Sequence, residues 1–130
     1  MTFRELFENA LRAIAERPSE SSISDYEERA GYILATFCTE CAPLDRRYRK
    51  AHGMNDASYA SSAYVELTKT VPFCDALTSA AVYYLCAMLT MDENESMSDT
   101  FFELYTDAIA TIQASLPGVC EPIADRYGMI

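Results

Sequence analysis

Two cysteines three positions apart form the pattern in this sequence that is best suited to chemistry. Cys38 and Cys41 have the spacing of metal-binding and of thiol-disulfide redox pairs. A structural zinc site needs four ligands, yet no second pair of this spacing follows, and His52, Cys74 and Cys120 lie at irregular distances. The pair also lies in a helical stretch without the βαβ pattern of a redox domain. We therefore expect two packed thiols, with no metal site and no redox site.

The other residues that could act in catalysis are scattered. His52 precedes Gly53 in a predicted loop, and a Cys-His nucleophilic pair would also need an exposed cysteine and a third group to orient it. Asp92, Glu93 and Glu95 lack the glycine and the terminal bidentate glutamate of an EF-hand loop, so a solvated turn explains them. No glycine-rich phosphate loop, nucleophile elbow or His-Glu-x-x-His pattern occurs. The sequence predicts no catalytic residues, no cofactor and no small-molecule substrate.

Four of the ten basic residues are concentrated between Arg46 and Lys50, with Tyr48 among them. The chain as a whole carries a net charge of −10, and residues 71–130 hold one Lys/Arg residue against nine Asp/Glu residues, a balance of −8. Contacts from this run to DNA phosphates would be weak and salt-sensitive in such an acidic chain. A patch that forms salt bridges with a partner protein is the favoured interpretation.

Length and composition indicate one soluble domain. The 130 residues suffice for a single core, and no apolar run approaches the roughly 20 residues that span a bilayer. The opening Met1 to Glu5 lacks the features of a signal peptide. Five cysteines form an odd set, and four of them lie among apolar neighbours, which is typical of reduced thiols in the cytoplasm. We expect no membrane contact and no export.

Apolar residues that recur every three or four positions predict an all-α fold with four helices, over residues 2–16, 24–41, 76–91 and 98–115. Thr2 with Glu5 and Ser24 with Glu27 have the capping-box spacing of helix starts, and Pro43 is expected to end the second helix. The fold expected from these signals is a four-helix bundle.

The second pair of predicted helices carries most of the apolar surface. Asp75 is a candidate N-cap for the helix over 76–91, which is the best candidate for the central core helix. Ser98 and Asp99 are expected to start the last helix, which ends before a tail over 117–130. The adjacent aromatic pairs, Tyr83-Tyr84 and Phe101-Phe102, should each place one ring in the core and one at its edge. The outer ring is either an interface residue or an ordinary half-buried aromatic.

Residues 44–73 form a long central excursion between the second and third predicted helices. The run Arg46–Lys50 could extend as a helical turn, but the polar residues after it favour a largely irregular loop. Tyr64–Val71 is rich in β-formers and predicts a short strand or β-arm, which would invite a neighbouring subunit if it found no partner in its own chain. The candidate partner contacts are Arg46, Arg47, Tyr48, Arg49, Lys50, Tyr64, Val65, Leu67, Val71 and Phe73.

The layout from Val71 to Ile112 resembles the back half of the small all-helical head-tail connector (adaptor, or head completion) proteins of phages. The resemblance rests on a hydrophobic entry, a tyrosine-bearing helix, an acidic elbow and an aromatic helix. These are Val71-Pro72-Phe73-Cys74-Asp75-Ala76-Leu77, Ala80-Ala81-Val82-Tyr83-Tyr84-Leu85-Cys86-Ala87, Asp92-Glu93-Asn94-Glu95 and Ser98-Asp99-Thr100-Phe101-Phe102-Glu103-Leu104-Tyr105. It covers about the last sixty residues, and the first half only by its number of helices.

The resemblance implies a non-enzymatic structural protein of a phage or prophage, which forms a ring under the portal and docks the tail. Its partners would be copies of itself and portal or tail proteins, while DNA passes at most non-specifically through an acidic channel that does not grip it. The protein would be found in the bacterial cytoplasm during assembly, and in the virion if the prophage is active. Deleting residues 44–73 should then abolish oligomerisation and leave the helices folded.

The alternative is a small cytoplasmic bacterial module, built of helices, for protein interaction or regulation. It would bind its partner through the run from Arg46 to Lys50.

Overall fold

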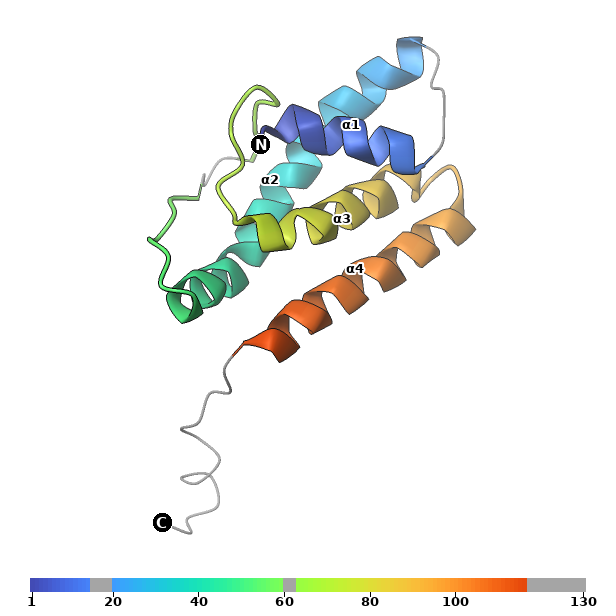
Figure 1. The fold of residues 1–130 in the computed structure, drawn as a ribbon. Coiled ribbons are helices and arrows are strands. Elements are labelled where there is room, and N and C mark those ends of the chain that lie inside the picture. The colour runs from blue at the N-terminus through green and yellow to red at the C-terminus, as the bar shows by residue number, and fades with distance from the viewer. Residues whose placement is uncertain (15–19, 60–62, 117–130) are drawn as a thin grey trace.

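A computed structural model describes residues 1–14, 20–59 and 63–116, with the side chains of 20–23 left aside. The described chain is mostly helical and contains four α-helices and one 3-10 turn, which confirms the all-α class (Figure 1). The elements are α1 (Phe3–Ala13), α2 (Glu20–Ala51), η1 (Asp75–Leu77), α3 (Thr78–Thr90) and α4 (Glu95–Ser115). The predicted tail over 117–130 and the last residues of the first predicted helix lie outside the described residues.

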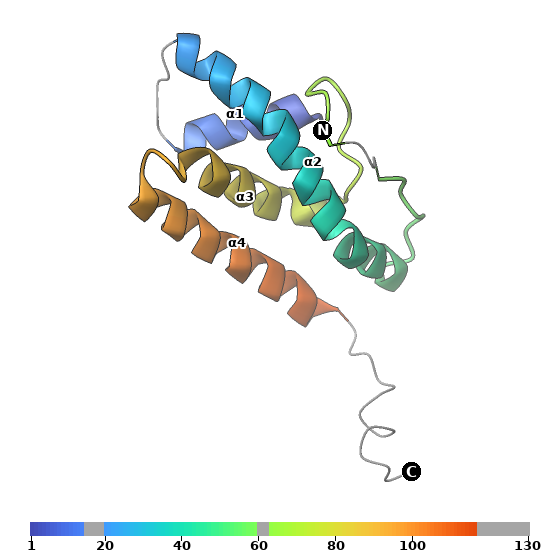
Figure 2. The same cartoon turned by 180° about the vertical axis from the view of Figure 1, so that it is seen from behind.

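Helix α3 is the hub of the fold, as the sequence predicted. It packs against α1, α2 and α4, and α4 makes its main contacts with α3 alone. Both cartoon views show α3 between α4 on one side and α1 on the other, with α2 crossing it obliquely (Figures 1 and 2). Because α4 makes its main contacts with α3 alone, the predicted four-helix bundle arrangement is not confirmed. No described helix combines the length and the apolar character that crossing a bilayer requires.

The end predicted for the second helix, at residue 41 before Pro43, is wrong. Helix α2 continues through the proline to Ala51, so the central excursion begins after that residue and not at Leu44. Proline removes one backbone N–H from the helix and disfavours it locally. Leu44 and Asp45, directly after Pro43, are buried, and this tertiary packing holds the helical path where local propensity alone would end it. The alternative helical reading of the run Arg46–Lys50 is the correct one.

The segment over Tyr64–Val71 forms no strand within the described chain. Its one β-type contact there is an isolated antiparallel bridge between Thr70 and Thr2. Its backbone pairs inside its own chain, because the N–H of Phe3 donates to Lys69 O at 3.0 Å and the N–H of Arg4 donates to Leu67 O at 2.9 Å. We call residues 64–71 the capping segment, since it satisfies the N–H groups that the start of an α-helix leaves without partners.

The predicted cap at Thr2 is confirmed, and it completes the capping of α1. The hydroxyl oxygen of Thr2 accepts a hydrogen bond from the N–H of Glu5 at 3.3 Å. On the other side, the N–H of Val71 donates to Met1 O at 3.0 Å. The chain start and the capping segment are therefore fastened to each other by backbone hydrogen bonds on both sides of the bridge.

Three of the predicted helix starts are wrong. Ser24 with Glu27 was expected to begin the second helix, but α2 already runs from Glu20, so Ser24 lies inside it. Asp75 makes no capping hydrogen bond and lies inside η1, which leads into α3. Helix α4 begins earlier than predicted, and its N-cap is Asn94, whose side-chain oxygen accepts from the N–H of Met97 at 3.0 Å. Ser98 is instead buried and donates its hydroxyl to Ala87 O at 2.7 Å. This hydrogen bond ties α4 to the hub helix.

Candidate functional site

A fully buried carboxylate organises the polar interior of the molecule. Asp45 on α2 accepts hydrogen bonds from Arg49 Nε at 2.8 Å, from the backbone N–H of Cys74 at 2.8 Å and from the hydroxyl of Tyr59. Burial by itself would raise the pKa of Asp45, but the hydrogen bonds from Cys74, Tyr59 and Arg49 outweigh it and hold the pKa below its ordinary value. Asp45 is thus an anchoring anion whose acceptor sites are used by its own chain.

Arg49 links Asp45 to two places in the connection between α2 and η1, one near its start and one near its end. Its terminal nitrogens donate to Pro72 O at 2.9 Å and to Asn55 O at 3.1 Å, and the hydrogen bond to Asp45 raises the pKa of the guanidinium. Separating this ion pair would leave an unpaired charge in the interior, which is costly. The connection is therefore held firmly on α2. Arg49 was predicted as a partner contact, and the structure uses it inside the chain.

The remaining cations of the run lie on the surface. Arg46, Arg47 and Lys50, which we call the basic surface, are exposed. They line an open hollow of about 710 Å³ together with Gly53, Met54, Asn55 and Asp56. The guanidinium of Arg46 lies 5.0 Å from the centre of the Tyr59 ring, a cation–π distance.

Tyr48 and His52 form a stacked pair next to the basic surface. Their ring centres are 4.1 Å apart, and a ring nitrogen of His52 lies 2.9 Å from Tyr48 O. His52 is exposed, which confirms it as a surface histidine. Tyr48, a predicted partner contact, is half-buried and packs against the core.

Most of the predicted contacts on the capping segment, and Phe73 just after it, point into the protein. Val65, Leu67 and Phe73 retain only 6%, 5% and 3% of their exposure, and Phe73 packs edge-to-face on Phe37 with ring centres 5.2 Å apart. Val71 is half-buried. These side chains build the core of this chain. The structure argues against the expectation that deleting residues 44–73 leaves the helices folded, because the deletion would remove the end of α2 and part of that core.

Tyr64 is the predicted contact of this segment that remains exposed, at 39%. Its ring lies edge-on to Tyr32, with centres 4.9 Å apart, and directly above Gly31 of α2. The next residue, Val65, donates its N–H to Gly31 O at 3.1 Å, and a Cβ at Gly31 would lie 2.1 Å from the Tyr64 ring. Gly31 therefore admits the capping segment onto the helix. A glycine inside an amphipathic helix is the signal in the sequence that could have indicated this close approach.

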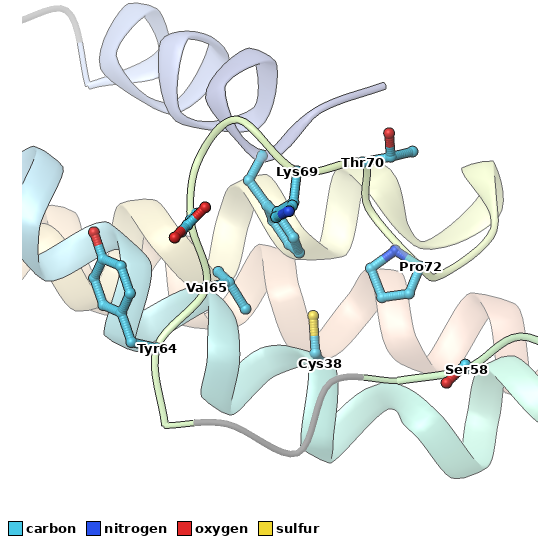
Figure 3. Close-up of a pocket in the computed structure, with 9 residues that line it drawn as sticks. Cys38, Ser58, Tyr64, Val65, Lys69, Thr70 and Pro72 are labelled. Carbon is cyan, nitrogen blue, oxygen red and sulfur yellow. The ribbon is translucent and has the colours of Figure 1, made fainter.

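A cavity of about 420 Å³ lies beneath the capping segment (Figure 3). The lining residues are Phe3, Cys38, Ser58, Tyr64, Val65, Glu66, Lys69, Thr70 and Pro72. The Cys38 thiol projects from α2 toward this space. Burial raises the pKa of Cys38 to about 11, so the thiol stays protonated at neutral pH and is a poor nucleophile. Chemically, the arrangement suits packing more than catalysis.

The other described cysteines are also buried. Cys41 donates its thiol to Cys38 O at 3.6 Å, and burial raises the pKa of Cys86 to about 12 and that of Cys74 to about 11. The prediction that Cys38 and Cys41 pack as thiols inside the helical core is confirmed. Among the described residues, no three His, Cys, Asp or Glu side chains gather in a way that could hold a metal ion. Cys120 lies outside the described residues.

Helix α4 presents an acidic stripe on its outer face. Glu95, Asp99, Glu103 and Asp107 are all exposed and recur every four residues. Phe102 lies beside the stripe and is half-buried. An open hollow of about 340 Å³ on this face is lined by Phe102, Glu103, Thr106 and Asp107.

The acidic elbow before α4 is exposed, as predicted for a solvated turn. One of its residues is nonetheless held in place, because Glu93 accepts a hydrogen bond from the hydroxyl of the buried Tyr26 on α2. The aromatic pair on α3 also follows the prediction, since Tyr84 is buried while Tyr83 is half-exposed.

Comparisons with known proteins identify no relative: no protein-family model matches the chain, and neither a curated protein nor a solved structure is significantly similar to it.

Proposed function

We propose that this chain is a non-enzymatic structural protein of a phage or prophage that acts as a head-tail connector. The observation that carries the proposal is the layout of residues 71–112. A hydrophobic entry leads through η1 into the tyrosine-bearing α3, and an acidic elbow then leads into the aromatic α4, as in the small helical connectors that this segment resembles.

The distribution of polar groups supports a scaffold. The buried polar side chains serve the fold: Asp45 anchors the connection between α2 and η1, Ser98 ties α4 to α3, and Thr90 bonds to its own helix. The charges that remain available lie on exposed helix surfaces, where they can meet other proteins. In a ring beneath a portal, such surfaces would join neighbouring copies and receive the tail.

The acidic character of the second half fits passage of DNA without binding. Asp92 in the elbow, Glu95 at the start of α4 and Asp99 one turn later are exposed. If these carboxylates face the channel of the ring, they repel the phosphate backbone and let it slide. Acids that point outward from the lumen of an assembled ring would contradict this part of the proposal.

Deletion of the gene from an inducible prophage tests the function. We expect DNA-filled heads without tails to accumulate in electron micrographs, and tailed particles to return when the wild-type chain is supplied from a plasmid. Mass spectrometry of purified particles should find the chain in virions. Normal tailed, infectious particles from the deletion strain would refute the connector function.

The alternative function is a cytoplasmic helical module that binds another protein through the basic surface. The exposure of Arg46, Arg47 and Lys50 in an otherwise acidic chain favours it. Pull-down with the full chain separates the two proposals. The module should capture one defined partner in cells without phage genes, and lose it when the three residues are changed to glutamate.

A further inference from the structure

The chain carries two exposed surfaces of opposite charge. The first is the basic surface at the end of α2, where Arg47 and Lys50 are exposed and form no ion pair with any described residue. The second is the outer face of α4, where Glu103 and Asp107 are exposed and likewise have no described cationic partner. Asp56 lines the same hollow as Arg47 and Lys50 but forms no ion pair with them, so within the described structure the two cations and the two carboxylates are each left without an ion-pair partner.

The α4 surface has the chemistry and the shape to accept a cationic side chain. Two carboxylates, Glu103 and Asp107, and the ring of Phe102 line its hollow of about 340 Å³. Carboxylates pair with guanidinium and ammonium groups, and an aromatic face attracts the same cations. The chain itself shows this second contact, since the Arg46 guanidinium lies 5.0 Å from the centre of the Tyr59 ring.

The spacing of the charges matches along the helix axes. Lys50 follows Arg47 by three residues, and Asp107 follows Glu103 by four, which at a rise of 1.5 Å per residue gives roughly 4.5 Å and roughly 6 Å. The flexible stems of the two cations easily cover that difference. One helix end can thus place both cations against both carboxylates at the same time.

We propose that the basic surface of one copy docks on the α4 hollow of a second copy, with Arg47 and Lys50 against Glu103, Asp107 and Phe102. Because the two surfaces differ, the contact is head-to-tail, and repeated contacts build a closed ring or an open chain of copies. This inference deepens the proposed function and rests on it for the expectation that copies meet. It names the surfaces through which they would do so.

The net charge of −10 sets the conditions under which the contact can be measured. Two such chains repel each other at long range. At about 0.15 M salt the Debye length is about 8 Å, so the long-range repulsion is screened more strongly than direct ion pairs. Association is therefore best measured near this ionic strength.

Sedimentation velocity of the full chain over a wide concentration range tests the contact by exchange of charge. The wild-type chain should associate as concentration rises. Arg47→Glu/Lys50→Glu should remain monomeric, and so should Glu103→Lys/Asp107→Lys, although this second variant is less acidic and repels its copies less. Mixing the two variants should restore association, and so should combining all four substitutions in one chain.

Matched controls keep the result interpretable. Glu8→Lys/Glu28→Lys changes the net charge by the same amount as the acidic-face variant, at two exposed residues away from either surface, and should associate like wild type. Circular dichroism verifies that each variant is folded. A wild-type chain that stays monomeric at all concentrations, variants that still associate, or a mixture that fails to recover would each overturn the proposed contact.

The result for this interface can be distinguished from the result for the connector function. Particles that need the chain, combined with a wild-type chain that never associates, would retain the function and remove this interface. Association that follows the charge exchange in a chain absent from virions would retain the interface and remove the connector function.

Discussion

Substituting Asp45 tests whether one buried carboxylate anchors the connection between α2 and η1. Asp45→Asn keeps the shape but turns one acceptor oxygen into a donor facing Arg49, Tyr59 or Cys74. Loss of one member of a buried ion pair costs about 3–5 kcal/mol, so we expect the free energy of unfolding in urea to fall by about that amount. Asp56→Asn, at an exposed position, is the control and should change it little.

The same variant should alter how stability depends on pH. The pKa of Asp45 is lowered in the folded state, so its stabilisation is fully present above the unfolded value of about 3.9 and is lost as pH falls through the folded value. Measured from neutral pH downward, the difference in unfolding free energy between wild type and Asp45→Asn should shrink in acid. A difference that stays constant down to the acid transition would show that the charge of Asp45 does not stabilise the fold.

Gly31 and Tyr64 should be energetically coupled. In the wild type, Gly31→Ala places a methyl group 2.1 Å from the Tyr64 ring and must displace it. When Tyr64 is first changed to alanine, the same substitution should stabilise α2 by about 1 kcal/mol through helix propensity. A double-mutant cycle on thermal unfolding measures the coupling, and additive effects would contradict the close packing of this pair.

At the residue scale, contacts between residues close together in the sequence were predictable, and contacts between distant residues were not. The cap at Thr2 depends on a residue three positions away, and it was predicted correctly. Asp75 and Ser98 carry the same kind of signal, but tertiary contacts gave Ser98 a buried partner on another helix. The role of Asp45 depends on Cys74, 29 positions along the chain, and periodicity contains no information about such a pairing.

At the scale of the elements, α2 shows how packing overrides a local stop signal. Pro43 is exposed on a helix that continues to Ala51, and it cannot donate a backbone hydrogen bond there. Pro43→Ala should therefore raise the free energy of unfolding by up to about 3 kcal/mol. The gain is reduced by the stabilisation that proline provides when it restricts the unfolded chain. Urea denaturation measures the gain. A loss of stability would mean that the proline shapes the helix in a way the fold requires.

The capping segment should protect amides that usually exchange quickly. The first N–H groups of a helix have no partner inside it, yet those of Phe3 and Arg4 donate to Lys69 O and Leu67 O. We expect hydrogen-exchange protection at both amides close to that of the middle of α1. Leu67→Ala, which loosens the segment's hold on the core, should reduce their protection more than that of α3. Fast exchange at both amides in the wild type would contradict the pairing.

The short strand predicted over Tyr64–Val71 does not form, and the reason is physical. The segment turns between Glu66 and Lys69, where the N–H of Lys69 donates to Glu66 O, and other polar groups of its backbone are used at the start of α1 and at Gly31. A run of β-forming residues does not show which backbone groups a segment will meet.

For the whole molecule, the buried thiols provide a measure of global opening. Cys38, Cys41, Cys74 and Cys86 are buried, and burial raises the pKa of each. In a Cys120→Ser variant, reaction with an aromatic disulfide reagent should be slow in buffer and should rise to four thiols with the urea unfolding curve. Rapid reaction of any thiol in native buffer would reveal local opening around that cysteine.

The general plan of the molecule was accessible from the sequence, because the most apolar helix became the hub. Its surroundings depend on contacts between segments far apart, such as the capping segment on α1 and Asp45 on Cys74. Amphipathic periodicity predicts which face of a helix is buried, but not which segment covers it.

The capping of α1 has a consequence for synthesis on the ribosome. The carbonyl groups that complete its first turn belong to residues translated about sixty positions later. At about 5–20 residues per second, the nascent helix waits several seconds before Leu67 and Lys69 are even made, and longer before they leave the exit tunnel. During that interval, the first N–H groups of α1 lack these acceptors and its apolar side lacks its packing partners. This chain therefore has to complete its N-terminal helix late in translation.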